Sequence, residues 1–359
     1  MFLTSAFQRR MKHSGAGPAL RSGTSGLRCT IFGAYGFVGR YVTQLMAGDG
    51  TQCIIPFRGD DMEWRHLRVM GDYGVVTPVP FSPRDEDSVR RVIQDADVVI
   101  NLIGKDWETT HYTPWLKNYS FDNTHVDVAS TIARISVEEG VSNLIHLSAL
   151  AADPYSISRW AQSKARGEEA VRAIAPGATI VRPADVFGTE DRFLNMFARM
   201  YQVMNRIPVV DGGHARVQPL FVEDLARAIY TIANVGGAPA VMLGQDYDLA
   251  GPDDYTHQEV IEYVFEVIRA IEPSVVNMSP SVADFVGNIA GIFPTPIVSS
   301  DRFQRMQADA VLNPMSTAKR LHDLGIEATS MEMPGFSFLH RFRSGSHFLD
   351  VAEGKTGRV

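Results

Sequence analysis

The glycine-rich segment GAYGFVG at 33–39 constrains the fold of this chain most strongly. It follows the apolar run at 28–32, and its glycines recur at every third position as Gly33, Gly36 and Gly39. Between a strand and a helix, such glycines permit a tight turn, the approach of backbone N–H groups to a pyrophosphate, and close packing of the helix on the strand. The segment predicts the opening of a dinucleotide-binding fold, with a tight turn that binds no ligand as the alternative.

Apolar runs alternate with helical stretches through the first half of the chain. The runs are nearly continuous in Val and Ile, as in parallel strands covered by helices on both faces. We therefore predict an α/β fold, a Rossmann-type doubly wound parallel sheet. The expected strands are 28–34, 52–59, 75–81, 97–104, 143–149 and 178–188, and the expected helices lie near 37–47, 85–95 and 158–174 and within 119–139.

The alternation loosens after residue 188, where no second glycine motif occurs. A smaller C-terminal lobe is expected there, packed at the carboxyl edge of the sheet, where open α/β sheets form their ligand crevice. The expected parts are a targeting or disordered tail at 1–27, a nucleotide-binding core at 28–188, the smaller lobe at 189–343 and a polar tail at 344–359.

The segment 281–298 is apolar, but Asp284, Pro294 and Pro296 interrupt it. It is therefore unsuited to span a bilayer, which takes about 20 uninterrupted apolar residues. We interpret it as a helix that packs within the C-terminal lobe. The alternative is an amphipathic element that docks on a partner or on a membrane surface.

The start of the chain is basic, whereas the remainder is acidic. Residues 1–27 contain Arg9, Arg10, Lys12 and Arg21 but no acid, so the formal net charge of −7 becomes −11 for the remainder. An acid-free segment with Arg and Ser is typical of a mitochondrial presequence, and a disordered basic tail is the alternative. The acidic body argues against nucleic acid as a partner.

The cysteines and histidines show no metal-ligand spacing. The chain has two cysteines, Cys29 and Cys53, both in apolar strand-like runs, which we interpret as buried thiols in a reducing compartment. We interpret His111, His125 and His146 as ordinary hydrogen-bonded residues rather than metal ligands.

The residue that ends the second strand decides between NAD and NADP. Here it is Arg58, 19 residues after Gly39, and Arg40 directly follows that glycine. Two guanidiniums can flank a 2′-phosphate, whereas Asp60 and Asp61 come too late for the usual ribose contact. NADPH is therefore the expected cofactor. The alternatives are NAD(H), or an Arg58 that is merely a solvated loop residue.

Residues 28–250 resemble the short-chain dehydrogenase/reductase superfamily in its extended or atypical branch. Besides the glycine motif, the resemblance is carried by NLIG at 101–104, HLSA at 146–149, VRPADVFG at 181–188 and FVEDLARAI at 221–229. A departure is Ser82, where many members place an aspartate near the adenine. The motif and the resemblance together imply these cofactor-binding residues: Gly33, Ala34, Tyr35, Gly36, Phe37, Val38, Gly39, Arg40, Arg58, Leu102, Ile103, Gly104, Ser148, Lys164 and Pro183.

The catalytic pattern of that superfamily is incomplete in this chain. The family needs a tyrosine and a lysine four apart on one helix face, so that the lysine lowers the pKa of the phenol that passes the proton. Trp160 stands at the tyrosine position, with Ser148 twelve residues earlier and Lys164 four later. An indole N–H is no acid or base near neutral pH, and Tyr155 has Arg159 rather than lysine four residues on.

We therefore expect no catalytic residue and no hydride transfer. Lys164 can still bind the nicotinamide ribose. Trp160 either stacks near the nicotinamide ring or packs on its helix.

Longer blocks resemble the nucleotide-binding accessory subunits of mitochondrial NADH:ubiquinone oxidoreductase, respiratory complex I. The resemblance implies a peripheral subunit on the matrix side of the inner membrane, at the junction of the two arms of the complex. It also implies contacts with other complex I subunits and a tightly bound structural NADPH off the electron path. The blocks are FGAYGFVGRYV (32–42), IIPFRG (54–59), HLRVMGDYG (66–74), VVINLIGKDWET (98–109), EDRFLNMFA (190–198) and LHDLGIEAT (321–329).

Two alternatives to this function stay open from the sequence. One is a free mitochondrial NADP-dependent reductase or epimerase with an unusual acid. The other is a sensor whose contacts within the complex respond to the NADPH/NADP⁺ ratio.

The segment 105–119 follows the fourth strand and is rich in Trp, Tyr and His. Trp107 and Trp115 are costly to leave in water, so we expect burial against the second lobe or another subunit. The alternative is a solvent-facing loop.

Overall fold

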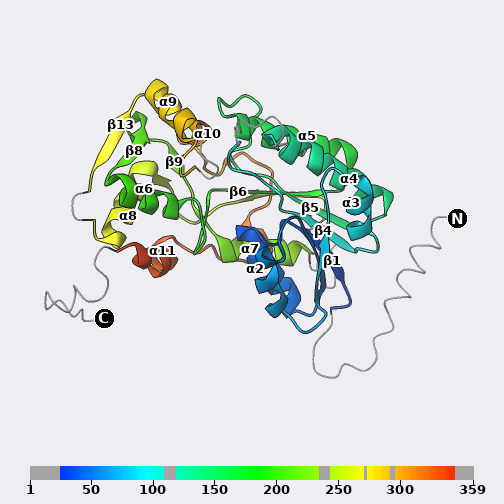
Figure 1. Cartoon of the computed structure of the whole chain (residues 1–359). Helices are drawn as coiled ribbons and strands as arrows, with labels where there is room; N and C mark the ends of the chain where they lie inside the picture. The colour runs from blue at the N-terminus through cyan, green and yellow to red at the C-terminus, as the bar shows by residue number, and fades with distance from the viewer. Residues whose placement is uncertain (1–24, 109–118, 234–242, 271–272, 292–295, 344–359) are drawn as a thin grey trace, which may run out of the picture.

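Figure 1 shows the computed structural model of the chain, which describes residues 25–108, 119–233, 243–270, 273–291 and 296–343. Its centre is a parallel sheet of seven strands in the order β11-β6-β5-β4-β1-β2-β3. The order reverses between β1 and β4, the switch point at which doubly wound sheets bind their ligands. The predicted fold class is therefore confirmed. The strands are β1 (Arg28–Phe32), β2 (Gln52–Phe57), β3 (Val76–Pro80), β4 (Val98–Asn101), β5 (Asn143–Leu147), β6 (Thr179–Pro183) and β11 (Asp246–Leu249).

Helices cover both faces of this sheet (Figure 1). Along β1, Ile31 packs into the core beneath α2 and α7, whereas Phe32 packs into the core on the opposite side. Successive side chains of a strand point to opposite faces, so continuous apolar runs are needed when both faces are buried. The helices of one face are α2 (Phe37–Gly48) and α7 (Val222–Ala233), and those of the other are α3 (Glu86–Ile93), α4 (Val128–Glu138) and α5 (Arg159–Ile174).

Two elements of this core come from beyond residue 188, where the sequence placed the smaller lobe. Strand β11 pairs in parallel with β6, and α7 packs on α2. The strand was not recognised because Asp246 and Asp248 interrupt its apolar pattern. Both carboxylates pair with Arg182 of β6, which allows an acidic segment to complete the sheet.

The second lobe has a hydrophobic core of its own and lies beside the carboxyl edge of the sheet (Figure 1). Its strands form three short pairs, β7 with β10, β8 with β13, and β9 with β12. These strands are β7 (Val186–Phe187), β8 (Ile207–Val210), β9 (Arg216–Val217), β10 (Leu220–Phe221), β12 (Tyr255–Thr256) and β13 (Val275–Met278). Its helices are α6 (Leu194–Met204), α8 (His257–Ile268), α9 (Pro280–Ala290), α10 (Ser300–Arg305) and α11 (Glu332–Leu339).

Cys29 and Cys53 are free, buried and opposite one another in β1 and β2, as expected of structural thiols. Burial raises the pKa of both thiols, that of Cys53 to about 12. Thiols held in the protonated form are poor nucleophiles and poor metal ligands.

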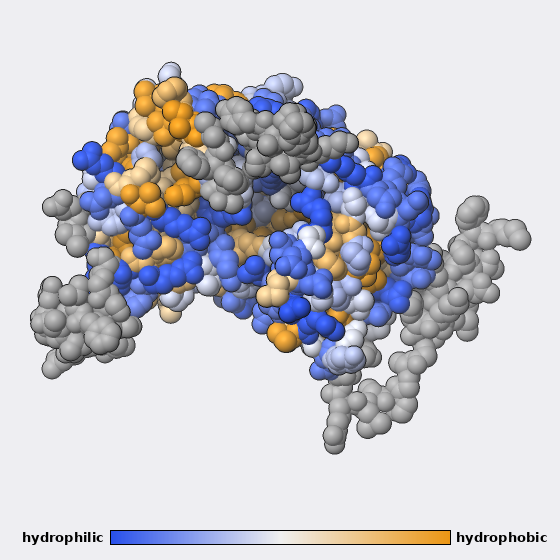
Figure 2. All heavy atoms as spheres, in the orientation of Figure 1, coloured by the Kyte–Doolittle hydropathy of each residue, from blue (hydrophilic) through white to orange (hydrophobic). Residues whose placement is uncertain are grey.

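Helix α9 begins at Pro280, at the start of the segment 281–298, and it packs through its small residues and through Asp284, which accepts hydrogen bonds from Ser300 and Gln304. Ala283 and Gly287 are buried, and a Cβ atom on Gly287 would lie 2.4 Å from the Ser300 backbone nitrogen. Phe285 is 67% exposed, and further exposed residues are Val282, Val286 and Ile289. Figure 2 shows this apolar surface over α9, at the upper left of the molecule. Among the described residues, no helix is long and apolar enough to cross a membrane.

Candidate functional site

Glycines fix the shape of the loop between β1 and α2. Gly33 has a φ of +80°, and the backbone N–H of Gly36 donates to the Gly33 oxygen at 3.0 Å. A Cβ atom on Gly39 would lie 2.2 Å from that oxygen, so only glycine fits there. Gly36 caps α2 without a side-chain hydrogen bond, and the first helical turn holds no acid. The N–H groups of this turn are therefore available to an anion such as a pyrophosphate.

A cavity of about 280 Å³ opens beside this loop. It lies where β1, β3 and β4 end, which is the ligand edge of a doubly wound sheet. The expected residues that line it are Gly33, Tyr35, Gly36, Arg58, Leu102, Ile103 and Gly104. The lining residues that the sequence did not identify are Phe81, Pro83, Lys105, Tyr119, Thr124 and Val128.

Two arginines contact one aromatic ring at this cavity. The Cζ atom of Arg58 lies 4.7 Å from the centroid of the Tyr119 ring, and that of Arg84 lies 4.2 Å from it. Arg84 follows β3, the neighbour of β2 in the sheet, and the sequence reasoning missed it. Its position a few residues beyond a predicted strand end was the signal that could have identified it, because neighbouring parallel strands end at the same edge.

Arg40 lies elsewhere. Its Nε donates to the Tyr35 carbonyl oxygen at 3.2 Å, and its Nη1 lies 3.8 Å from a Glu190 carboxylate oxygen. Neither Arg40 nor Arg84 is among the residues that line the cavity, but Arg84 contacts the Tyr119 ring that Arg58 also contacts. The remaining motif residues pack behind the loop: Ala34 and Val38 in the core, and Phe37 edge-on to Tyr41.

Ser148 and Lys164 lie where the nicotinamide half of a dinucleotide is expected. The Lys164 Nζ donates to the Leu147 carbonyl oxygen at 3.2 Å, and a Cβ atom on Gly104 would lie 3.5 Å from that Nζ. Burial lowers the pKa of Lys164 to about 8. The Ser148 hydroxyl is buried without a hydrogen-bond partner among the described residues. An unpaired hydroxyl and a buried ammonium, beside a glycine cradle, fit a dinucleotide ribose.

Trp160 stands at the position of the family's catalytic tyrosine, and both the N–H edge and the face of its indole ring contact other groups of the chain. The Trp160 Nε1 donates to the Lys105 carbonyl oxygen at 2.8 Å, and the Arg305 Cζ lies 4.2 Å from the ring centroid. Tyr155 is 92% exposed and offers no replacement phenol. The described site therefore contains no tyrosine acid beside Lys164.

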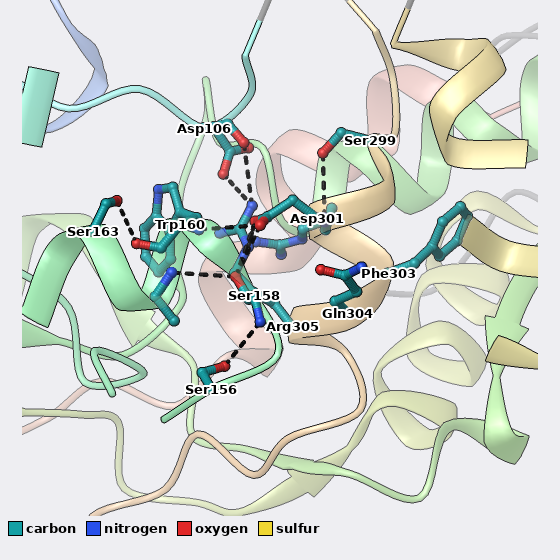
Figure 3. Close-up of polar contacts among 12 residues, drawn as sticks. Asp106, Ser156, Ser158, Trp160, Ser163, Ser299, Asp301, Phe303, Gln304 and Arg305 are labelled. Atoms are coloured by element: carbon teal, nitrogen blue, oxygen red, sulfur yellow. Dashed lines mark hydrogen bonds and ion pairs between the residues drawn. The ribbon is translucent and has the colours of Figure 1, made fainter. Parts of the chain in front are cut away.

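Helix α10 of the second lobe is tied to the start of α5, as Figure 3 shows. The Asp301 carboxylate accepts hydrogen bonds from the Trp160 backbone N–H at 3.1 Å and from the Ser158 hydroxyl at 3.0 Å. Arg305 pairs with Asp106 at 2.5 Å and with Asp301 at 3.4 Å. Burial raises the pKa of Asp106, but the charges of Arg305 and Arg302 outweigh it and hold the value at about 2.

The cleft beside Trp160 is small as a result. It measures about 50 Å³, and Pro183, His257, Arg302 and Arg305 are among the residues that line it. It is far smaller than the cavity of about 280 Å³ beside the glycine loop. Pro183 thus lies at this cleft and not in the larger cavity.

His125 and His146 are buried and hydrogen-bonded, as expected. The His125 ring contacts the Ser163 hydroxyl at 2.8 Å and the Lys105 backbone N–H at 3.1 Å, and His146 contacts the Asn101 amide at 3.2 Å. Burial lowers their pKa values to about 2 and about 3. Within the described ranges, no group of three or more His, Cys, Asp or Glu side chains could hold a metal. His111 lies outside the described residues.

Trp107 is half-buried against the second lobe, which confirms the expected burial for this one residue of the segment 105–119. The Arg192 Cζ lies 4.2 Å from the centroid of its ring. Trp115 lies outside the described residues.

Comparison with known proteins agrees with this geometry. The NAD dependent epimerase/dehydratase family matches residues 29–244. The chain is 37% identical over 336 residues to NADH dehydrogenase (ubiquinone) 1 alpha subcomplex subunit 9, mitochondrial, of Arabidopsis thaliana, covering 90% of this chain and 80% of that protein. It is 34% identical over 328 residues to the NADH-ubiquinone oxidoreductase 40 kDa subunit, mitochondrial, of Neurospora crassa, covering 91% of this chain and 83% of that protein.

Among solved structures, the NADPH-dependent quinone oxidoreductase of Escherichia coli complexed with NADPH has a TM-score of 0.64. The alignment covers 87% of this chain and 99% of that chain at 15% identity. At this identity the likeness shows a shared fold.

Proposed function

The chain belongs to the family of NADH dehydrogenase (ubiquinone) 1 alpha subcomplex subunit 9, within the NAD dependent epimerase/dehydratase family, and we propose that it is a non-catalytic accessory subunit of mitochondrial respiratory complex I. In this role it holds NADPH as a structural cofactor. It works as a peripheral subunit on the matrix side of the inner membrane, where it contacts other subunits at the junction of the peripheral and membrane arms.

The stack of Arg305 on Trp160 is the observation that carries the non-catalytic role. A reductase of this fold needs an acid at that position and room for a carbonyl compound beside it. Here the position holds an indole whose N–H is already hydrogen-bonded to the Lys105 carbonyl oxygen, and the adjacent cleft measures about 50 Å³. The proton donor is therefore lost, and little space remains for a substrate beside it.

NADPH is favoured by Arg58, which lines the cavity beside the glycine loop, and by Arg84, which contacts the same lining ring. Arg58 and Arg84 both contact the Tyr119 ring, and a guanidinium pairs with a 2′-phosphate through two charge-assisted hydrogen bonds. The Lys164 ammonium and the Ser148 hydroxyl would bind the ribose beside the nicotinamide. A nucleotide that binds only the native chain stabilises that chain, which suits a structural cofactor.

The apolar side of α9 supports a role as one subunit among others. Phe285 is 67% exposed, and three more large apolar residues of the helix are exposed beside it. A contiguous apolar patch on a soluble surface is typical of a protein interface. We assign this face to contact with another complex I subunit.

Native size and bound nucleotide, measured together, test this function. Mitochondria that contain the chain are solubilised in mild detergent and separated by native size, and the nucleotide released on denaturing the fraction with the chain is identified. We expect a very large NADH-oxidising assembly with about one NADPH per copy of the chain. A small species with readily exchanged nucleotide would instead indicate a free reductase or epimerase.

A further inference from the structure

A second cavity, of about 250 Å³, lies between the two lobes and shares Arg302 with the Trp160 cleft. Its walls come from the loop after β4, from α6 and from the segment that leads into α10. The lining residues are Asp106, Trp107, Asp191, Arg192, Met196, Arg199, Pro296, Ile297, Ser299 and Arg302. None of them lines the cavity beside the glycine loop.

Arg302 is buried at this cavity, and some of its N–H donors have no hydrogen-bond partner among the described residues. Its side chain is 8% exposed, and its Nη1 pairs with Asp185 at 3.2 Å. Its Nε and Nη2 have no hydrogen-bond partner among the described residues. An unsatisfied buried donor on a charged group is costly, so such a group commonly marks a place where a ligand supplies the acceptor.

Two further arginines project from α6 and its start, and the Asp106 carboxylate acts on one of them, Arg192, through its charge without forming an ion pair. Arg192 contacts the Trp107 ring, and Arg199 has no ion pair within the described part of the chain. The Asp106 carboxylate is paired with Arg305. The Asp191 carboxylate accepts hydrogen bonds from two backbone N–H groups, those of Asn195 at 2.8 Å and Gly188 at 3.1 Å.

We propose that the cavity formed by Arg192, Arg199 and Arg302 binds a phosphate-bearing ligand with an apolar substituent. Three guanidiniums around one space match a tetrahedral anion with several acceptor oxygens better than a single carboxylate. Met196, Pro296 and Ile297 provide an apolar wall beside them, which suits the ester group of the ligand. This site is separate from the nucleotide cavity and does not depend on the proposed NADPH.

A phosphate group of this kind comes either from a soluble phosphate ester or from a phospholipid headgroup. The test uses the full chain saturated with NADPH, so that the nucleotide site does not report the added phosphate. Inorganic phosphate is titrated while thermal unfolding is followed. In parallel, the chain is sedimented with phosphatidylcholine vesicles that contain or lack phosphatidic acid.

The double variant Arg192→Gln/Arg199→Gln tests the site without disturbing buried Arg302, because both side chains are exposed at the cavity mouth. The matched control Arg91→Gln/Arg206→Gln removes the same charge from two other exposed positions. Whichever probe binds the unchanged chain, we expect the double variant to bind it at least about tenfold more weakly. The control should bind that probe as the unchanged chain does.

The pattern of binding then identifies the source of the phosphate. Stabilisation by inorganic phosphate without vesicle binding indicates a soluble ester, and vesicle binding that requires phosphatidic acid indicates a headgroup. The proposal is wrong if the unchanged chain responds to neither probe, or if the double variant keeps the response.

Discussion

The guanidinium of Arg305 lies over the indole ring of Trp160, with its Cζ 4.2 Å from the ring centroid. This contact joins the second lobe to the nucleotide-binding core at the position where a catalytic family member has its phenol. Asp301 binds the backbone N–H of the same tryptophan, so one turn of α10 holds the start of α5 in two ways (Figure 3). The loss of the catalytic acid and the closure of the cleft are thus one structural feature.

Restoring the phenol alone is not expected to restore chemistry. In Trp160→Tyr, a tyrosine stands four residues before Lys164, but the cleft beside it remains close to 50 Å³ because Arg305 is unchanged. Oxidation of NADPH with small aldehydes and ketones should stay at background, measured by loss of nicotinamide absorbance. Turnover by Trp160→Tyr that disappears on adding Lys164→Ala would contradict the closed cleft.

Removing Arg305 should destabilise the chain strongly. Its side chain is 9% exposed, and Arg305→Ala leaves Asp106 and Asp301 without their cation. Breaking a buried ion pair costs about 3–5 kcal/mol of unfolding free energy. The matched control is Arg159→Ala, which removes the pair with Glu108 at a position that is 67% exposed and should cost at most about 1 kcal/mol. Urea unfolding gives the free energy of unfolding of both variants. Equal losses in the two variants would show that the Arg305 contact of α10 adds nothing to the stability.

Lys164→Met should stabilise the nucleotide-free chain while weakening nucleotide retention. Burial lowers the pKa of Lys164 from 10.5 to about 8, so keeping it charged at pH 7 costs about 3.5 kcal/mol at 1.4 kcal/mol per pH unit. The folded-state pKa lies below the unfolded-state value, so the penalty is complete below pH 8 and disappears as the pH rises towards 10.5.

Thermal unfolding of the two nucleotide-free proteins across pH 7–10 checks this. The greater stability of the methionine variant relative to the unchanged chain should shrink steadily above pH 8. A constant difference across that range would mean that the lysine charge is not its cause. Bound NADPH after purification is the independent readout, and it should fall in the variant.

Reversing the charge at the nucleotide cavity should remove NADPH and weaken assembly together. Arg58→Asp places an acid where the 2′-phosphate is expected, and Arg84→Gln removes the second guanidinium at the Tyr119 ring. Losing one charge-assisted hydrogen bond costs about 1.5–3 kcal/mol, or roughly tenfold to a hundredfold in affinity. NADPH retained after purification is measured, with NADH binding as the comparison.

The control for this experiment is Arg65→Asp, an equal charge change at an exposed position of the same segment. It should leave NADPH retention unchanged. Normal retention of NADPH by Arg58→Asp would rule out the 2′-phosphate role.

Polar substitution on the open face of α9 should affect assembly and not folding. Phe285→Ser changes a side chain that is 67% exposed in the isolated chain, so thermal unfolding should move little. If this face contacts another subunit, the amount of the chain in the large native assembly should fall several-fold. Met315→Ser, at a position that is 91% exposed elsewhere, is the control. Unchanged incorporation of Phe285→Ser would remove α9 from the interface.

Local patterns in the sequence determined the nucleotide-binding frame. Gly33, Gly36 and Gly39 act within a single turn, where Gly33 has a positive φ and Gly39 leaves no room for a Cβ atom, so their spacing can be read without the fold. The apolar runs of β1, β4, β5 and β6 were predicted correctly because both faces of these central strands are buried, whereas the edge strand β3 is partly exposed. Trp160 was recognised because its helix carries the catalytic spacing to Lys164.

The tertiary structure alone decided which distant residues meet. Strand β11 completes the sheet because its two aspartates form ion pairs with Arg182. Arg84 contacts the ring that Arg58 contacts because β2 and β3 end side by side. Arg305 closes the cleft through Asp106, 199 residues earlier in the chain. Spacing along a chain encodes contacts within a turn, a helix face or a strand, whereas pairing across such separations depends on how the whole fold brings the elements together.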